Sequence, residues 1–100
     1  HEMYPVVEPE QNADYMVADI VGPVCESGDY LALDRNLPVL KAGDQIAIGS
    51  AGAYGAVQSG TYNSRLLVPE VIVNKGQFHV ARPRPSYDDL IAQDSIPSWL

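Results

Sequence analysis

The sequence predicts an all-β fold, a small β-sandwich or Greek-key barrel domain with one short helix. Five or six short apolar segments have the length and composition that are typical of strands. Turn signals made of glycine, proline, asparagine and aspartate separate these segments at intervals of roughly ten residues, as in sandwiches and barrels. A serine followed by two aspartates near the carboxyl end predicts the helix. One hundred residues are enough for one small domain with its own core.

The amino-terminal half is predicted to begin with an extended lead-in over residues 1–12 and to continue as strands. Residues 15–21 are an apolar run that reads as a strand, and since both faces of this strand are largely apolar, we expect it to pack between two layers. The elements that follow are, in order, a strand over 30–33, a polar loop over 34–36, an apolar segment over 37–40, a tight turn over 41–44 and a half-buried strand over 45–48.

The carboxyl-terminal half opens with a stretch rich in small residues, 50–60, in which Tyr54 is the single aromatic residue. Small residues allow the backbone to approach another group closely. The stretch is not a dinucleotide-binding fingerprint, because no helical run of suitable length follows it. A polar and aromatic cluster over 61–65 follows. Next come a strand over 66–73, which lies at an edge or carries a bulge at Pro69, and a hairpin turn over 74–76 that leads into a strand over 77–82. Ser86 is predicted to cap a helix over 86–91.

Composition and charge exclude several classes of function. The formal net charge of −7 argues against nucleic-acid binding, because proteins of that class carry basic patches. No apolar run approaches the ~20 residues that cross a membrane. The single cysteine excludes a disulfide framework and a multi-cysteine zinc site, and we expect no metal. It also fits a reducing compartment, and since no signal peptide is visible, we expect a cytoplasmic protein.

A chemically distinctive stretch, the thiol–carboxylate loop, lies between the first two predicted strands at residues 22–29. Gly22-Pro23 ends the first strand because proline cannot donate to a strand ladder, and Gly28-Asp29 turns the chain into the second. Between these breakers the chain presents Cys25 and Glu26, a thiol beside a carboxylate. Short connections between strands often hold reactive groups in this way. The alternative is a buried, inert cysteine next to a solvated glutamate.

Several motifs follow one another in order along the chain. They are Gly-Pro-Val-Cys-Glu-Ser-Gly-Asp at 22–29, Ala-Gly-Ala-Tyr at 51–54, Tyr-Asn-Ser-Arg at 62–65, Pro-Glu-Val at 69–71 and Tyr-Asp-Asp-Leu at 87–90. With these motifs the chain resembles the carboxyl-terminal β-domain of the diaminopimelate decarboxylase family, pyridoxal-phosphate enzymes of the alanine-racemase-like fold type. The resemblance covers most of the chain. It implies a β-domain over 13–92, a tail over 93–100 and a larger β/α barrel that precedes this fragment.

The resemblance implies conversion of meso-2,6-diaminopimelate to L-lysine and carbon dioxide, a step of lysine biosynthesis. In the family, a lysine on the barrel holds pyridoxal 5'-phosphate as a Schiff base, and the cofactor absorbs the electrons left when carbon dioxide departs. Lys41 and Lys75 lie in predicted exposed turns, so we expect neither to hold the cofactor. The fragment alone is therefore expected to be inactive. The resemblance also implies a homodimer whose active sites are shared between the protomers.

The resemblance further implies roles for individual residues. Cys25 corresponds to the catalytic residue that returns a proton to the α-carbon, and a thiol can act as an acid at neutral pH. Glu26 corresponds to the substrate-binding residue that accepts the distal ammonium. Tyr54 corresponds to a tyrosine that lies at the substrate and reaches the cofactor or its phosphate. The alternative for Tyr54 is a core tyrosine.

Two residue roles and two other functions stay open. Tyr62 is either a packing or a contact residue, and Arg65 either pairs with Glu70 or approaches a substrate carboxylate. A decarboxylase of the same fold that acts on ornithine, arginine or carboxynorspermidine would keep the cysteine, but the resemblance implies different residues after it. A non-catalytic β binding module would need an aromatic groove or an apolar patch, and the eight aromatic residues are scattered along the chain.

Overall fold

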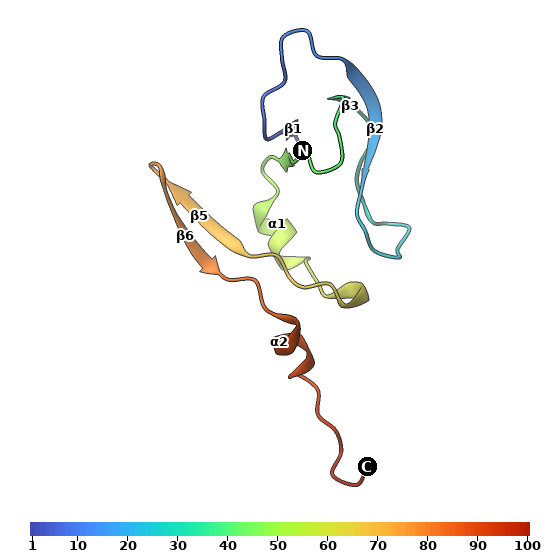
Figure 1. Ribbon diagram of the computed structural model, residues 1–100, viewed down its shortest axis with the longest axis vertical. Helices are drawn as coiled ribbons and strands as arrows, with labels where there is room; N and C mark the ends of the chain where they lie inside the picture. The colour runs from blue at the N-terminus through green and yellow to red at the C-terminus, as the bar shows by residue number, and fades with distance from the viewer. The chain divides into compact units, whose positions relative to one another are not determined.

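The computed structural model describes residues 1–100 and contains strands that pair into three two-stranded antiparallel sheets (Figure 1). The elements are β1 (Met3–Pro5), β2 (Tyr15–Val21), β3 (Tyr30–Pro38), β4 (Ile46–Ile48), α1 (Gly52–Val57), the 3₁₀ turn η1 (Tyr62–Ser64), β5 (Glu70–Asn74), β6 (Gln77–Arg82) and α2 (Tyr87–Ile91). The all-β prediction is confirmed, although the sheets do not close into a barrel. The chain divides into two units, His1–Tyr54 and Gly55–Leu100, with the boundary inside α1.

The β2–β3 hairpin of the first unit carries the core. Ile20 of β2 and both Ala32 and Leu37 of β3 are buried, with 8%, 7% and 3% of their surface exposed. Met3 of β1 and Ile46 of β4 are partly buried and pack against this cluster, so the β1–β4 sheet lies against the β2–β3 sheet. The opposite face of β2 is exposed. We expected β2 to lie between two layers, but this chain covers only one of its faces.

β3 runs through residues 34–36, where the sequence predicted a polar loop. Asp34 has a positive φ of 52°, and its N–H donates to Asp19 Oδ1 at 2.9 Å. The register between β2 and β3 shifts beside Asp19. The extra residue therefore forms a bulge, and pairing continues on its far side. The loop prediction is wrong because these polar residues belong to a bulged strand whose extra N–H is satisfied by a carboxylate from the neighbouring strand.

β1 lies within the segment predicted as an extended lead-in and pairs antiparallel with β4. The tight turn predicted before β4 is confirmed. Lys41 N–H donates to Asp44 Oδ2 at 2.7 Å, and Asp44 N–H donates to the Lys41 carbonyl oxygen at 3.0 Å. Gly43 supplies the positive φ of 96° that the turn needs. β4 begins one residue later than predicted, at Ile46.

The structure has a second short helix, α1, where the sequence predicted one helix in the whole chain. It occupies the stretch rich in small residues. Alanine has the highest helix propensity and favours the helix at Ala53 and Ala56, although the two glycines of α1 disfavour it. Ser59 follows the helix and donates from Oγ to the Ala56 carbonyl oxygen at 2.6 Å. In η1, which comes next, Asn63 and Ser64 have positive φ angles of 55° and 58°.

The β5–β6 hairpin of the second unit forms at the predicted turn. Lys75 and Gly76 have positive φ angles of 49° and 77°, as a type I′ turn requires. β5 begins at Glu70, directly after Pro69. The predicted strand over 66–73 is therefore too long, because the proline lacks the N–H that pairing needs. A register shift follows the first residue of β5, next to the place where a bulge was predicted.

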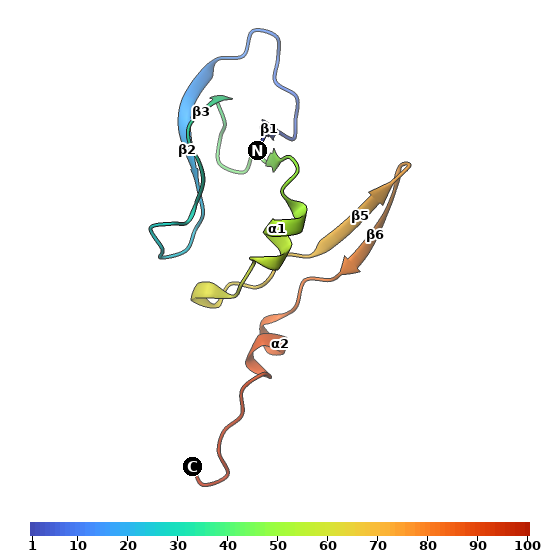
Figure 2. The same cartoon turned by 180° about the vertical axis from the view of Figure 1, so that it is seen from behind.

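β5 and β6 form an antiparallel hairpin (Figure 2). The residues paired across it give its two faces different polarity. Val71 lies opposite Val80, and Val73 lies opposite Phe78, so these four side chains share one face. We call them the apolar hairpin face. All four side chains are exposed, from 44% for Val80 to 75% for Phe78. This chain therefore provides no cover for the apolar hairpin face.

The helix α2 begins at the predicted cap. Asp89 N–H donates to Ser86 Oγ at 3.1 Å, and Ser86 N–H donates to Asp89 Oδ2 at 2.9 Å, which makes a reciprocal capping box. The backbone bond from Ser86, and then its hydroxyl, lower the pKa of the Asp89 carboxyl below its ordinary value of 3.8. Neither α1 nor α2 has the length and apolar character of a membrane-spanning helix.

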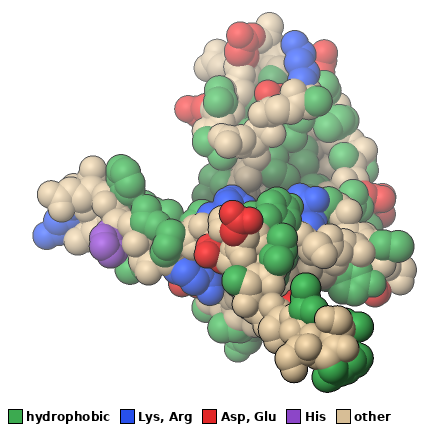
Figure 3. All heavy atoms as spheres, turned by 60° about the horizontal axis from the view of Figure 1, so that its bottom comes forward, with side chains coloured by type: hydrophobic (Ala, Val, Ile, Leu, Met, Phe, Trp, Pro, Cys, Tyr) green, Lys and Arg blue, Asp and Glu red, His purple; other side chains and the backbone are tan.

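The buried core is small. It consists of Ile20, Ala32 and Leu37. Large apolar side chains elsewhere are mostly in contact with solvent, and Figure 3 shows hydrophobic atoms in green over much of the visible surface. Apolar surface on this scale is unusual for a stable monomer. Contacts beyond these 100 residues are needed to cover it.

Candidate functional site

The thiol–carboxylate loop joins β2 to β3 and is closed by backbone hydrogen bonds. Gly22 N–H donates to the Asp29 carbonyl oxygen at 2.8 Å, and Asp29 N–H donates to the Glu26 carbonyl oxygen at 3.0 Å. β2 ends directly before Gly22 and β3 begins directly after Asp29. The predicted breakers are therefore confirmed, and the loop is a tight connection on a paired hairpin.

The Asp29 carboxylate lies over the base of this loop. Its Oδ2 accepts a hydrogen bond from Val24 N–H at 2.8 Å, in a partly buried position. A β-carbon at Gly22 would overlap this carboxyl group, which provides all three of the nearest atoms. The sequence marked Asp29 only as a turn residue and missed this contact. The signal that could have indicated it is a short carboxylate placed opposite a glycine at the base of a hairpin.

Cys25 and Glu26 lie next to each other on the loop, and both residues are exposed. The alternative of a buried cysteine is therefore wrong for this chain. Glu26 Oε1 accepts from Gly28 N–H at 3.2 Å, which orients the carboxylate within the loop. A carboxylate has two oxygens that accept hydrogen bonds, so Oε2 can serve a second donor. The loop thus presents a thiol and a carboxylate side by side.

Tyr54 comes from a different element, α1, and 76% of its surface is exposed. It is therefore not a core tyrosine in this chain. A β-carbon at Gly52 or Gly55 would meet no atom within 4 Å, so α1 is uncovered at these two positions as well. Of the three predicted site residues, the structure brings Cys25 and Glu26 together on one loop and presents Tyr54 on a separate helix.

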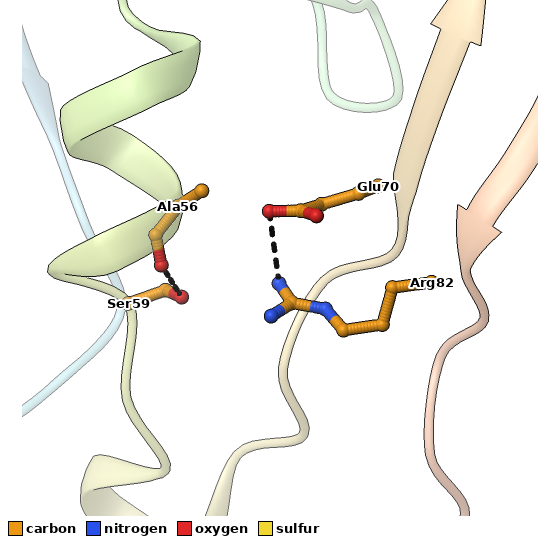
Figure 4. A network of polar contacts seen from close by, with 4 residues as sticks. All are labelled: Ala56, Ser59, Glu70 and Arg82. Carbon is orange, nitrogen blue, oxygen red and sulfur yellow. Dashed lines mark hydrogen bonds and ion pairs between the residues drawn. The ribbon is translucent and has the colours of Figure 1, made fainter.

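The two residues whose roles stayed open, Tyr62 and Arg65, are both exposed. Tyr62 therefore lies outside the core. Glu70, the partner considered for Arg65, instead has its Oε1 3.5 Å from Nη2 of its cross-strand neighbour Arg82 (Figure 4). Nε and Nη2 of Arg82 are shielded from water and make no hydrogen bond within the chain, although the side chain as a whole is 40% exposed. The contact is thus an ion pair without hydrogen-bond geometry.

The other groups that a cofactor or metal site would use are spread along the chain. Lys41 lies in the turn before β4 and Lys75 at the tip of the β5–β6 hairpin, as predicted, and both are exposed. Neither is enclosed in the way a lysine that holds a cofactor covalently would be. No three histidine, cysteine, aspartate or glutamate side chains lie close enough together to hold a metal ion.

A cavity of about 670 Å³ lies in the first unit and is lined by residues from 5–13 and 38–45. It is at the end of the hairpin where β2 starts and β3 ends, whereas the thiol–carboxylate loop is at the other end. At about 3.3 Å per residue, β2 alone separates the two by roughly 20 Å. We therefore do not include this cavity in the candidate site.

Comparison with known proteins places the chain among carboxyl-terminal sheet domains. The family described as pyridoxal-dependent decarboxylase, C-terminal sheet domain, matches residues 1–52, which include the thiol–carboxylate loop. The chain is 48% identical over 93 residues to the diaminopimelate decarboxylase of Archaeoglobus fulgidus. This alignment covers 93% of this chain and 21% of that protein. It is 45% identical over 83 residues to the diaminopimelate decarboxylase of Zymomonas mobilis, with coverage of 83% and 20%.

Solved structures agree with this comparison. The structure of diaminopimelate decarboxylase from M. jannaschii matches this chain with a TM-score of 0.87 and 35% sequence identity. The match covers 100% of this chain and 22% of that chain. The structure of diaminopimelate decarboxylase from Helicobacter pylori, complexed with L-lysine, matches with a TM-score of 0.80 and 35% sequence identity. The match covers 93% of this chain and 22% of that chain. The chain spans about a fifth of the length of the relatives it matches.

Proposed function

Since the chain belongs to the pyridoxal-dependent decarboxylases, as their carboxyl-terminal sheet domain, we propose that it is part of a diaminopimelate decarboxylase. The whole enzyme converts meso-2,6-diaminopimelate to L-lysine and carbon dioxide in the cytoplasm, and this chain supplies Cys25, Glu26 and Tyr54 to the active site. One observation carries the proposal. The segment that matches the family presents Cys25 directly beside Glu26 on an exposed, hydrogen-bonded loop.

Cys25 is the proposed proton donor. Loss of carbon dioxide breaks a carbon–carbon bond and leaves the electron pair on the α-carbon, which must take up one proton to give lysine. Bound pyridoxal 5'-phosphate supplies the stabilisation of this electron pair. The Sγ–H bond of Cys25 breaks as the new C–H bond forms, and the thiolate then regains a proton from water. General acid catalysis of this kind contributes typically about 10²–10⁴-fold in rate.

Glu26 is the proposed recognition group for the substrate's distal ammonium. This ammonium belongs to the amino-acid centre that does not react, so a contact with it selects the substrate without touching the reacting carbon. The bond from Gly28 N–H to Oε1, 3.2 Å long, orients the carboxylate before the substrate binds. A charge-assisted hydrogen bond from the ammonium contributes about 1.5–3 kcal/mol.

Tyr54 is the proposed contact to the cofactor and the substrate. Its hydroxyl can donate a hydrogen bond to a phosphate oxygen, and the exposure of Tyr54 leaves its side chain accessible to such a group. The residues present thus fit a chain that contacts pyridoxal phosphate. The lysine that holds the cofactor belongs to another part of the protein, because Lys41 and Lys75 lie in exposed turns.

We also propose that the enzyme is a homodimer in which this loop completes the active site of the partner. Support comes from the exposure of the loop, which leaves Cys25 and Glu26 accessible to another surface. The extensive uncovered apolar surface also suits a segment that packs against further protein.

A chimaera tests the proposed function. These 100 residues replace the matched carboxyl-terminal segment of the M. jannaschii enzyme, whose structure covers the whole chain. We expect the chimaeric holoenzyme to release carbon dioxide from meso-diaminopimelate and to form L-lysine, and we expect Cys25→Ala to abolish most of this activity. Ornithine, arginine and carboxynorspermidine are the competing substrates.

The parent M. jannaschii enzyme is the control for folding and cofactor loading. A folded, cofactor-loaded chimaera that prefers ornithine, arginine or carboxynorspermidine would show that the chain serves a different decarboxylase. A chimaera with no decarboxylase activity, beside an active parent, would contradict a catalytic contribution from this chain.

A further inference from the structure

We propose that Asp29 is a positioning residue for the thiol–carboxylate loop, and that position 22 is glycine because the Asp29 carboxylate occupies the space of its side chain. The proposal rests on the proposed function, since the groups that Asp29 holds in place are Cys25 and Glu26. The contacts of Asp29 in this chain are all with the loop and the end of β2. Asp29 acts through Val24, the residue directly before Cys25.

The backbone hydrogen bonds of the loop fix Asp29 first. Its carbonyl oxygen accepts from Gly22 N–H at 2.8 Å, and its N–H donates to the Glu26 carbonyl oxygen at 3.0 Å. Asp29 is therefore attached both to the end of β2 and to the middle of the loop. With its backbone held on both sides, its short side chain has few positions available.

The Asp29 carboxylate then fixes Val24. Oδ2 accepts from Val24 N–H at 2.8 Å, and the Val24 carbonyl oxygen accepts from Glu26 N–H at 2.9 Å. Both polar backbone groups of Val24 are thus bound, one on each side of its Cα atom. Because Cys25 lies between Val24 and Glu26 in the chain, these two bonds restrict the backbone that carries the thiol.

Gly22 is matched to this arrangement. The three atoms closest to a β-carbon at this position are Oδ1, Oδ2 and Cγ of Asp29, all too close for a real contact. The φ of Gly22 is not in the left-handed region, so backbone strain does not require glycine here. The steric demand comes from Asp29. Alanine at position 22 would push the carboxylate away and break its bond to Val24.

The expected effect on catalysis follows from the loop geometry. A displacement of about 1 Å of a reacting group can cost about 10²-fold in rate. We therefore expect Asp29→Ala to lower kcat by about 10- to 100-fold in the chimaeric holoenzyme. Asp29→Asn keeps a side-chain oxygen that can accept from Val24 N–H, so it should retain most of the activity.

Asp19→Ala is the matched control. Asp19 is also an aspartate of this hairpin, and it also accepts one backbone N–H, from Asp34 at 2.9 Å, but it lies away from the loop. The two alanine variants should therefore lower the melting temperature by similar amounts. Only Asp29→Ala should lower kcat, and only Asp29→Ala should speed the hydrogen exchange of the Val24 amide.

The pairing with Gly22 gives a second test. Gly22→Ala alone should lower kcat about as much as Asp29→Ala, because each removes the same hydrogen bond. The double variant should be no worse than Asp29→Ala alone, because the added methyl then has no carboxylate to displace. If Asp29→Ala does not fold, Gly22→Ala and Asp29→Asn still compare a broken bond with a retained one.

Three results would overturn the proposal. They are wild-type kcat in folded Asp29→Ala, equal damage in Asp29→Asn and Asp29→Ala, and additive losses in the double variant. Failure of the proposed function is a separate result: the unmutated chimaera would then not decarboxylate meso-diaminopimelate. In that case the exchange rate of the Val24 amide in the Asp29 variants still decides whether the carboxylate holds the loop.

Discussion

Glu26→Gln in the chimaeric holoenzyme isolates the negative charge of the proposed recognition group. Glutamine keeps the length of the side chain and an oxygen that can accept from Gly28 N–H, the bond that measures 3.2 Å in the structure. Because Glu26 is exposed on a loop, its replacement should change the free energy of unfolding by no more than about 0.5 kcal/mol. A larger loss of activity then reports the loss of charge.

The size of the loss follows from the contact that is removed. A hydrogen bond to a charged group contributes about 1.5–3 kcal/mol, and each 1.36 kcal/mol is a factor of ten in rate, so kcat/KM for meso-diaminopimelate should fall about 10- to 160-fold. Glu26→Asp keeps the charge but withdraws it by one methylene, about 1.5 Å, and should lose part of this amount. Because the ammonium is remote from the reacting carbon, its binding energy can raise kcat as well as lower KM, so the loss can appear in either constant.

The assay measures carbon dioxide release from meso-diaminopimelate and from 2-aminopimelate, which lacks only the distal amino group. Glu26→Gln should weaken the reaction of the diamine and leave that of 2-aminopimelate nearly unchanged. Equal losses on both substrates would mean that Glu26 acts on the loop or on the chemistry. An unchanged kcat/KM in folded, cofactor-loaded Glu26→Gln would show that Glu26 does not bind the ammonium.

Three further predictions concern the missing lysine, the partner protomer and the cap of α2. The purified 100-residue chain, given pyridoxal phosphate and meso-diaminopimelate, should release no carbon dioxide, and release above a buffer blank would refute this. Cys25→Ala enzyme, mixed with enzyme that lacks the cofactor-binding lysine and re-associated, should recover about a quarter of wild-type activity. About half of the randomly formed dimers are mixed, and each mixed dimer has one complete active site out of two. Mixed dimers that stay inactive would argue that Cys25 serves its own protomer. Because the pKa of Asp89 is lowered in the folded chain, its stabilisation of α2 is present above the ordinary value of 3.8 and is lost as the pH falls through the folded value. The NMR shifts of residues 86–91 should follow this loss in the wild type, and an identical titration in Ser86→Ala would contradict it.

The elements that the sequence predicted well are those whose cause is local. β2 begins and ends where the predicted apolar run, residues 15–21, does. The turn at Lys75 and Gly76 follows from Gly76, which accepts a positive φ angle, and the start of α2 follows from the Ser86 cap. In each case a few neighbouring residues contain all of the relevant chemistry. The exposed loop with Cys25 and Glu26 was predictable for the same reason, because its breakers flank it directly.

The features that the sequence did not predict depend on partners far along the chain. Asp34 continues β3 because Asp19, fifteen residues earlier, accepts its N–H. The role of Asp29 depends on its meeting Gly22 and Val24 after the hairpin has formed. The extent of the core also could not be predicted, because alternation predicts which face of a strand is apolar and not whether this chain covers it.

The residues of the proposed site differ in what holds them in place. The loop with Cys25 and Glu26 is fixed by bonds within residues 22–30 and stands on the hairpin that carries the core, so its shape is set wherever the hairpin is folded. Tyr54 lies on a helix of six residues that buries none of them, and helices this short are marginal without packing. The position of Tyr54 must therefore be fixed by protein that packs against α1. We therefore expect substitutions of Cys25 and Glu26 to act directly on the proposed proton transfer and recognition, whereas substitutions around Tyr54 should act through the assembly of the whole enzyme.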